Sequence, residues 1–393
     1  MKSPFDLSTP LLQTWAGCFL ALHGMLFPLP ASATTTIVAG EARTVSQEFS
    51  KSVQREFPIQ ADGTVSLHNR HGKTTVRTWS KPMTRIDVTI RVEARTAEDA
   101  ADVFERIDID FSNTPRSVRA ETVISSSNSW WSWGGSDDKY EIDYLVHLPA
   151  SVNLELEHHY GDVVADPLDG KADVRVKYGN VRLEGIRQEL RLELSYGNGT
   201  VVEARQTDAK IAYGKLYVNK TNRATLLTRY SKIFIDQATE AVIDSRYDQF
   251  EIGPVEHLDV DARYGNLEIE SVSSIRCKAN YTDIIIRQLT ESGDFDMSYG
   301  GLRILHLPDR FSQLLLTGQY TDFRVAVAPE AAYTLEATCS YADLRYPANL
   351  QITLDQTRST SREVKGYARQ QQATGRIKAT ASYGGLRLSL ADR

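Results

Sequence analysis

Three carboxylates, Asp244, Asp259 and Asp261, are the strongest candidates for catalysis in this sequence. Two carboxyl groups held on one exposed face at the correct separation are the machinery of glycoside hydrolysis. Arginines recur at regular intervals close to these acids and would pair with them at the surface: Arg229, Arg246 and Arg263. Because such ion pairs account for the acids, we predict a protein that is not an enzyme, with a polysaccharide-acting lyase or hydrolase as the alternative.

The histidines gather at His158 and His159 and at His68 and His71, with His147 between these pairs. A zinc site needs three or four convergent nitrogen, sulfur or carboxylate ligands, usually at a compact sequence spacing. The sequence has no such spacing, so we predict no metal and no cofactor. We expect these histidines in a polar interface instead.

Three tryptophans, Trp130, Trp131 and Trp133, lie in a segment of serine, asparagine and glycine residues that runs from Ser125 to Asp138. Large aromatic side chains in an otherwise polar loop are typical of contact surfaces. We therefore predict that these three side chains bind a ligand or partner. Packing of the tryptophans against the neighbouring strands is the alternative.

An arginine stripe forms a second candidate surface, because arginines occupy the same position in four late repeats: Arg303, Arg324, Arg345 and Arg387. Such a stripe could meet an anionic glycan or a lipid head group. Each side chain could equally lie along the sheet with its charged end in water, and we favour this second interpretation.

Twelve tyrosines reveal the elements that must position these side chains, since most of them recur every 17 or 18 residues: Tyr160, Tyr178, Tyr196, Tyr213, Tyr230, Tyr247, Tyr264, Tyr281, Tyr299, Tyr320, Tyr341 and Tyr383. A fixed period of this size indicates stacked supersecondary units. Apolar residues alternate before each tyrosine, as in Leu190, Leu192 and Leu194, and return after two turn residues. We predict an all-β, single-stranded parallel β-solenoid (β-helix) with coils of about 17 residues, right-handed.

The tyrosines have the same parity as the apolar residues that precede them. In a strand, residues of one parity point to one face. We therefore expect the tyrosines to form an inward or corner-facing ladder. An exposed stripe that stacks on carbohydrate is the alternative.

The repeats are interrupted near the N-terminal end. An early repeat runs from Val65 to Trp79, and we expect its His71 beneath Tyr160 and its Asn69 beneath His158. The following residues predict a strand over 85–94, a helix capped by Thr96, and strands near 117–124 and 140–148. Because a solenoid end exposes unpaired strand edges, we interpret this small α+β insertion as a cap.

The sequence divides into five expected segments: a signal peptide (1–33), a linker (34–54), the first coil with the capping insertion (55–153), the solenoid coils (154–346), and a polar excursion with a final coil (347–393). The signal peptide is predicted from an apolar stretch followed by Ala31-Ser32-Ala33 as the cleavage site. We do not expect lipidation at Cys18. No later segment is long and apolar enough to span a bilayer.

The formal net charge is −6 and the sequence has no basic run, which argues against a nucleic-acid partner. Cys277 and Cys339 take inward positions three coils apart, which exceeds the reach of a disulfide. We therefore predict that both are buried free thiols.

The repeat motif resembles a known family. Tyr160-Gly161-Asp162-Val163, Tyr178-Gly179-Asn180-Val181 and Tyr264-Gly265-Asn266-Leu267, behind a signal peptide, resemble the bacterial putative adhesins of the uncharacterised β-solenoid type, common in Bacteroidetes. The likeness covers about residues 55 to 390. It implies a binding role and brings no catalytic residues. Corners such as Ser231-Lys232 and Asp248-Gln249 depart from the motif, so a ligand site at the corners is not expected.

These observations lead to one functional expectation. We expect a non-enzymatic, exported binding or adhesion module of the cell envelope, in the periplasm or at the outer membrane and cell surface of a Gram-negative bacterium. Its partner would be a glycan or another cell-surface component. A structural envelope scaffold that associates through its ends is a further alternative.

Overall fold

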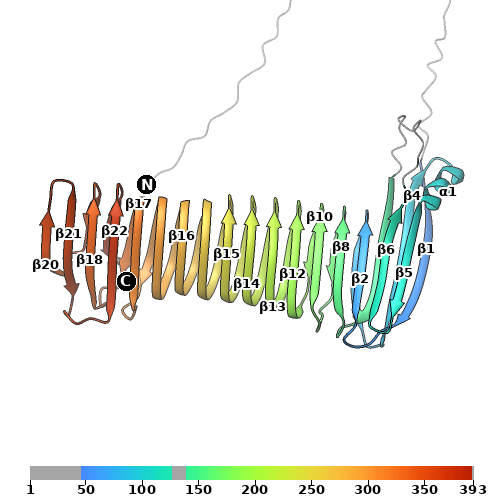
Figure 1. Cartoon of the computed structure of the whole chain (residues 1–393), viewed down its shortest axis with the longest axis horizontal. Coiled ribbons are helices and arrows are strands. Elements are labelled where there is room, and N and C mark those ends of the chain that lie inside the picture. Colours follow the sequence, from blue (N-terminus) through green and yellow to red (C-terminus); the bar gives the residue numbers. More distant parts are fainter. Residues whose placement is uncertain (1–45, 126–138, 392–393) are drawn as a thin grey trace, which may run out of the picture. The chain divides into compact units, whose positions relative to one another are not determined.

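The computed structural model describes residues 46–125 and 139–391, within the compact unit Val45–Arg393. In this part of the chain the fold is all-β with one helix, and the strands belong to a large, mostly parallel sheet that does not close on itself (Figure 1). None of the described helical residues forms a segment with the length and apolar character needed to cross a membrane. The predicted signal peptide, Cys18 and the three tryptophans lie outside the described residues.

From β8 to β16, neighbouring repeats pair in parallel, each residue with its counterpart 17 or 18 positions away. Val174 of β10 (Ala172–Lys177), for example, lies between Leu156 of β8 (Asn153–His159) and Leu192 of β12 (Ile186–Ser195). All three side chains are buried, while the intervening polar residues face outward. The remaining strands of the repeats are β2 (Thr64–Arg70), β3 (Thr74–Trp79), β9 (Val163–Ala165), β11 (Val181–Leu183), β13 (Asn198–Ala212), β14 (Lys215–Arg229), β15 (Lys232–Arg246), β16 (Gln249–Leu307), β17 (Gln313–Val327), β18 (Tyr333–Ser340), β19 (Asp343–Arg345), β22 (Gly375–Ser382) and β23 (Gly385–Leu390).

Each repeat contributes a strand segment before its tyrosine and another after it, so the segments form two rows. The rows face each other across one apolar core. Gly199, in the second row, illustrates this packing, because a Cβ at this position would lie 3.1 Å from Leu194 and 3.8 Å from Leu192 of the first row. Alternation with period two therefore predicted the buried residues correctly in both rows.

The tyrosine at each junction between the rows has a left-handed backbone, with φ between 51° and 62°, and so does His71. All twelve side chains are exposed, with Tyr178 the least exposed at 41% and Tyr341 the most at 61%. The prediction of an inward or corner-facing ladder was therefore wrong in its inward form, because the rings stack outside the corners. Side chains alternate between faces only while the backbone stays extended, and a left-handed residue turns its side chain out of that alternation.

The residue after the tyrosine lies very close to the corner of the preceding repeat. A Cβ on Gly179 would be 1.8 Å from the carbonyl oxygen of Gly161, which explains the glycine. In other repeats this position holds a small polar residue whose side chain is buried, so those corners leave room for a Cβ. Thr282 and Thr321 each donate a hydroxyl hydrogen bond to the carbonyl oxygen two residues earlier.

The N-terminal end extends both rows with strands from the predicted insertion. β6 (Ser117–Ile124) pairs with β2, and β5 (Ile107–Thr114) pairs antiparallel with β6. On the other row, β7 (Lys139–Pro149) pairs with β3, followed by β4 (Met83–Ala94) and β1 (Gln47–Pro58) in antiparallel order. The helix α1 (Ala97–Arg106) is capped by Thr96, as predicted. Gln47–Pro58 was expected to lie largely in a linker, but its apolar residues Phe49 and Phe57 pack on the core.

The C-terminal end does not follow chain order. β22 pairs in parallel with β17 on one side and with β18 on the other, so the last repeat lies between the two repeats that precede it in the sequence (Figure 1). The expected excursion is a hairpin of β20 (Leu350–Thr357) and β21 (Ser361–Ala368), and β21 pairs antiparallel with β18. Cys277 and Cys339 are buried free thiols as predicted. The inserted repeat places them four repeats apart rather than three.

Candidate binding surface

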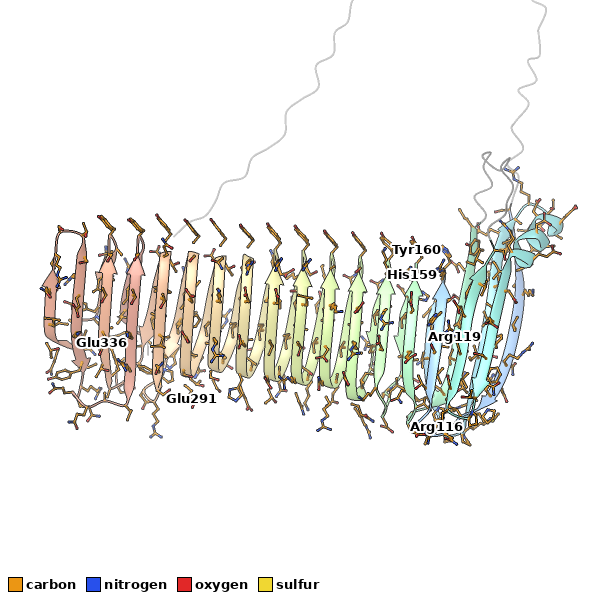
Figure 2. All side chains as sticks on the ribbon, in the orientation of Figure 1. Arg116, Arg119, His159, Tyr160, Glu291 and Glu336 are labelled. Atoms are coloured by element: carbon orange, nitrogen blue, oxygen red, sulfur yellow. The ribbon has the colours of Figure 1, made fainter. Side chains whose placement is uncertain are left out.

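The tyrosines form a continuous external stack, which we call the tyrosine ladder: His71 followed by Tyr160, Tyr178, Tyr196, Tyr213, Tyr230, Tyr247, Tyr264, Tyr281, Tyr299, Tyr320, Tyr383 and Tyr341. Neighbouring ring centroids are 4.7 to 5.1 Å apart and the planes differ by 2° to 14°. Figure 2 shows a regular row of side chains projecting from one edge of the strands, with Tyr160 among them. The ladder therefore runs the length of the repeats.

Each inner ring of the ladder has both of its faces covered by the neighbouring rings. At the N-terminal end Tyr140 packs edge-on against His71 at 5.1 Å, while the outer face of Tyr341 has no further ring in the described residues. A sugar that stacks on an aromatic residue needs an open ring face, and the inner rungs offer only their edges and hydroxyl groups. None of the twelve hydroxyls has a hydrogen-bond partner within the described part of the chain, so they face solvent as a row of free donors and acceptors.

A short polar ladder follows the first rungs at the second residue after the tyrosine. Asp162 Oδ1 accepts hydrogen bonds from the backbone and side-chain nitrogens of Asn180, at 3.0 and 2.9 Å. Asn180 Oδ1 accepts the same pair of bonds from Asn198, at 3.1 and 2.9 Å. These bonds hold the corners of the first repeats in register beside the tyrosines.

The four predicted stripe arginines are neighbours in space. Arg324 lies between Arg303 and Arg387 on adjacent strands, and Arg387 lies beside Arg345. Arg345 pairs with Asp343 at 2.6 Å, while the other three have no ion-pair partner among the described residues. Like charges directly opposite each other on a sheet are unfavourable. Arg303 and Arg324 line a shallow depression at Gly301 together with Asp283 and Asp322, so acidic side chains offset part of this charge.

The candidate catalytic acids lie on adjacent strands, with Asp244 directly opposite Asp261. Asp261 pairs with Arg263 at 3.6 Å, as the sequence suggested, and Asp259 pairs with Arg276 at 3.6 Å. Their arginine partners are exposed and account for two of the three acids. Asp259 lines one depression and Asp244 lines another, and Asp261 lines neither of the two.

The histidines separate into two environments. His71 stacks on Tyr160 as the first rung, and burial is the main cause that lowers its pKa. His158 is fully buried, and burial lowers its pKa to about 4. Its Nε2 donates to the Gly72 carbonyl at 2.9 Å, and its Nδ1 accepts from Thr74 Oγ1 at 3.2 Å. Among the described residues, no group of histidine, cysteine and acidic side chains could hold a metal ion.

The two hydrogen bonds of His158 belong to a larger buried network at the N-terminal end. Asn69 donates to Thr74 Oγ1 at 3.3 Å and to the Ile142 carbonyl at 2.8 Å, and accepts from Thr122 Oγ1 at 3.0 Å. Tyr144 completes the network through Thr122 at 2.9 Å. Asn69 lies opposite His158, as expected from the repeat alignment. Thr122 and Tyr144 were not predicted, because only tertiary pairing brings them to the repeat.

A buried carboxylate at one corner was also not predicted from the sequence. Asp248 follows its tyrosine, and its side chain accepts four hydrogen bonds, from the hydroxyls of Thr228 and Ser245 and from the backbone nitrogens of Ser231 and Arg246. Burial raises its pKa, against the effect of these four donors. Asp248 therefore points into the fold, and its carboxylate is not available to a ligand.

The two cysteines are unsuited to chemistry at the surface. Burial raises the pKa of the Cys277 thiol to about 12 and that of Cys339 to about 11. The reactive form of cysteine is the thiolate, so both side chains act as small apolar residues of the core.

No family model and no curated protein sequence matches this chain. Among solved structures, it is similar to a putative cell adhesion protein from Clostridium sporogenes, with 9% identity, 88% of this chain and 99% of the other covered, and a TM-score of 0.18. A putative lipid binding protein from Parabacteroides distasonis shows 12% identity over 63% of this chain and 95% of the other, with a TM-score of 0.31. A putative adhesin from Parabacteroides merdae shows 12% identity, with 70% and 92% covered and a TM-score of 0.25. The adhesion proteins among these carry the same name as the family that the repeat motif resembles.

Proposed function

We propose that this protein is a non-enzymatic, exported β-solenoid of the cell envelope that binds an extended glycan along the tyrosine ladder. The solenoid is supported by the alternation of the chain between two rows of parallel strands around one core. Export rests on the sequence of the first 33 residues. The absence of catalysis rests on the ion pairs that account for Asp259 and Asp261.

The row of free tyrosine hydroxyls is the observation that carries this proposal. A left-handed backbone costs roughly 1 to 2 kcal/mol for a residue other than glycine. Stacking of aromatic pairs, at about 0.5 to 1.5 kcal/mol each, offsets that strain, but phenylalanine would stack equally well. The hydroxyls add nothing to the hydrogen bonding among the residues that the structure describes, so we assign them to a ligand.

The chemistry of the ladder fits a glycan. Its ring centroids recur every 4.7 to 5.1 Å, so a polymer that runs along the rod can form the same contact with each successive unit. The rings present edges rather than faces, which favours hydrogen bonding to sugar hydroxyls over ring stacking. The arginines beyond Tyr299 would suit acidic units at that end of the ligand.

A glycan array with wild-type protein and the triple variant Tyr230→Phe, Tyr247→Phe and Tyr264→Phe tests the proposal. Phenylalanine keeps the stacking and removes three hydroxyls, so folding is preserved while affinity falls roughly ten-fold or more. Tyr217→Phe is the matched control, because Tyr217 is an exposed tyrosine outside the ladder that stacks on Phe234 at 4.4 Å. Unchanged binding by the triple variant would refute the role of the ladder.

The non-enzymatic part of the proposal has its own test. Bound glycans are incubated with the protein, and released reducing ends are measured. We expect no release. Release that disappears in the double variant Asp244→Asn and Asp261→Asn would instead support the alternative of a polysaccharide-acting enzyme.

The location is tested by labelling intact cells with a reagent that cannot cross the outer membrane. Labelling of the protein before cell lysis places it on the surface, and labelling only after selective permeabilisation of the outer membrane places it in the periplasm. Recovery with the cytoplasmic proteins would refute export.

A further inference from the structure

We infer that the position between β17 and β18 is a strand-binding slot, and that the last repeat, residues 375–391, can leave it and enter the slot of a second copy of this chain. The last repeat consists of β22, Tyr383 and β23. It lies between two repeats that adjoin each other in the sequence. This inference is independent of the proposed glycan binding.

The strands on either side of the slot, β17 and β18, can pair with each other when the last repeat is absent. The segment 308–312 joins β16 to β17, and those strands pair directly. The segment 328–332 has the same number of residues and joins β17 to β18, which lie on either side of β22. Tyr320 is as far from Tyr299 in sequence as Tyr341 is from Tyr320. Direct pairing of β17 with β18 therefore needs no new connection and no shift of register.

The last repeat is also attached to the rest of the fold by a short exposed link. Ala368 at the end of β21 and Gly375 at the start of β22 both pair with Tyr333, from opposite sides. Residues 369–374 therefore cross over the end of β18, and most of them are exposed. Six extended residues reach roughly 20 Å, enough to redirect the repeat toward a neighbouring molecule at the same end.

The first strand of the last repeat buries small side chains, and β23 adds Leu386 and Leu388. β22 contributes Ile377, Ala379 and Ala381 to the core, whereas the corresponding positions of β12 are Leu190, Leu192 and Leu194. Each buried methylene is worth about 0.8 kcal/mol, so β22 is held by less apolar burial than β12. The inner strands β13, β14 and β15 also bury small residues at these positions. Removal of β22 costs correspondingly less than removal of β12, while its two rows of backbone hydrogen bonds still provide specificity for an extended segment.

A second copy is the partner that fits the slot, because its last repeat restores each of these contacts. Exchange of identical elements between two copies leaves the list of interactions unchanged and closes a symmetric dimer through the C-terminal ends.

Engineered disulfides between full-length chains test the exchange. Thr317 and Thr380 are exposed and lie directly opposite each other across β17 and β22, at a strand spacing that a disulfide can bridge. One tagged chain carries Thr317→Cys and the other Thr380→Cys, both with Cys18→Ser, and the two are coexpressed so that exchange can occur during folding. The native Cys277 and Cys339 are buried.

We expect a disulfide-linked heterodimer on a non-reducing denaturing gel. A pairing of Thr225→Cys with Thr380→Cys is the control, since Thr225 lies on β14 in the middle of the rod and should give no heterodimer. The double variant Thr317→Cys and Thr380→Cys in one chain shows that the native contact can form its disulfide. Formation of that intrachain bond without any heterodimer above the control would overturn the inference.

Discussion

The two ends of the rod protect their strand edges in different ways. At the N-terminal end, antiparallel strands and a helix cover the repeats, and the buried network of Asn69, Thr74 and His158 fixes the junction. At the C-terminal end, a hairpin covers the last strands, and the final repeat is inserted between earlier ones. The side chains of a buried polar network need specific hydrogen-bond partners, so the network tolerates few other arrangements. A strand with the common repeat pattern can pair with any strand edge of the same pattern. We therefore expect the N-terminal end to be fixed and the C-terminal end to be exchangeable.

The largest contrast should come from alanine at equivalent corner glycines. A Cβ on Gly161 would lie 1.6 Å from the Gly72 carbonyl oxygen, and a Cβ on Gly384 would lie 2.1 Å from that of Thr321. Gly161→Ala should destabilise the whole repeat region by roughly 4 kcal/mol or more. The added Cβ would meet the Gly72 carbonyl and would also lie 2.7 Å from Nε2 of the buried His158. Gly384→Ala should release only the last repeat. Hydrogen exchange by mass spectrometry distinguishes the two, and cooperative loss of protection throughout the rod in Gly384→Ala would contradict the contrast.

The N-terminal network should also make stability depend on pH. Burial lowers the folded-state pKa of His158 to about 4, whereas an unfolded histidine titrates near 6.5. The unfolded state therefore binds more protons between these values, so stability falls as the pH drops from about 6.5 toward 4, by about 3 kcal/mol in total.

Denaturant unfolding of wild type and His158→Gln at pH 7 and pH 5 measures this effect, with the variant as reference for all other titrating groups. The stability lost on acidification should be smaller in the variant. An equal loss in both proteins would remove His158 as the cause. His257→Gln is the matched control, because His257 is exposed on the rod and bonds only to Ser274.

Removal of a single hydroxyl should cost more stability at the N-terminal end than at the C-terminal end. Thr122→Val removes the group that joins Asn69 to Tyr144 and should cost about 1 to 3 kcal/mol, since their polar atoms stay buried. Thr380→Val on the exposed side of β22 should change stability by less than about 0.5 kcal/mol. Equilibrium denaturation measures both, and similar costs for the two would argue that the ends are held alike.

The smallest expected difference lies at the ends of the tyrosine ladder. Tyr160 stacks on two rings, His71 and Tyr178, whereas Tyr341 stacks on Tyr383 alone. Replacement by alanine should therefore cost about 0.5 to 1.5 kcal/mol more at Tyr160 than at Tyr341, the value of one aromatic pair. Thermal unfolding of both variants, each compared with its phenylalanine counterpart, gives the difference. A greater cost at Tyr341 would mean that stacking does not dominate the energetics of the ladder.

The repetitive part of the fold could be predicted because strand alternation is a local property. Leu190, Leu192 and Leu194 reveal their buried face without any knowledge of their neighbours, and Thr96 reveals the start of the helix. The exposure of the tyrosines could not be predicted from parity, because the left-handed backbone at each corner breaks the alternation on which parity depends.

It was harder to predict which strands pair with each other than to predict which side of a strand is buried. The residues before Tyr341 and before Tyr383 match the same repeat pattern, so nothing in the pattern decides which of them follows β17 in space. Similarly, Thr122 and Tyr144 read as ordinary strand residues until their strands meet the first repeat. The three tryptophans predicted to bind a ligand lie outside the described residues, so that prediction stays open to mutation and binding experiments.

The corner tyrosines also show that the length of the protein is proportional to its number of repeats. Each repeat adds one ring and about 4.8 Å of length, independently of the amino acids on its outer faces. Duplication or loss of one repeat would therefore change the reach of the molecule by a fixed step, while each remaining corner keeps its local geometry. The number of rungs counts the units of a polymer that could lie alongside, so selection for a longer or shorter partner can act on repeat number alone.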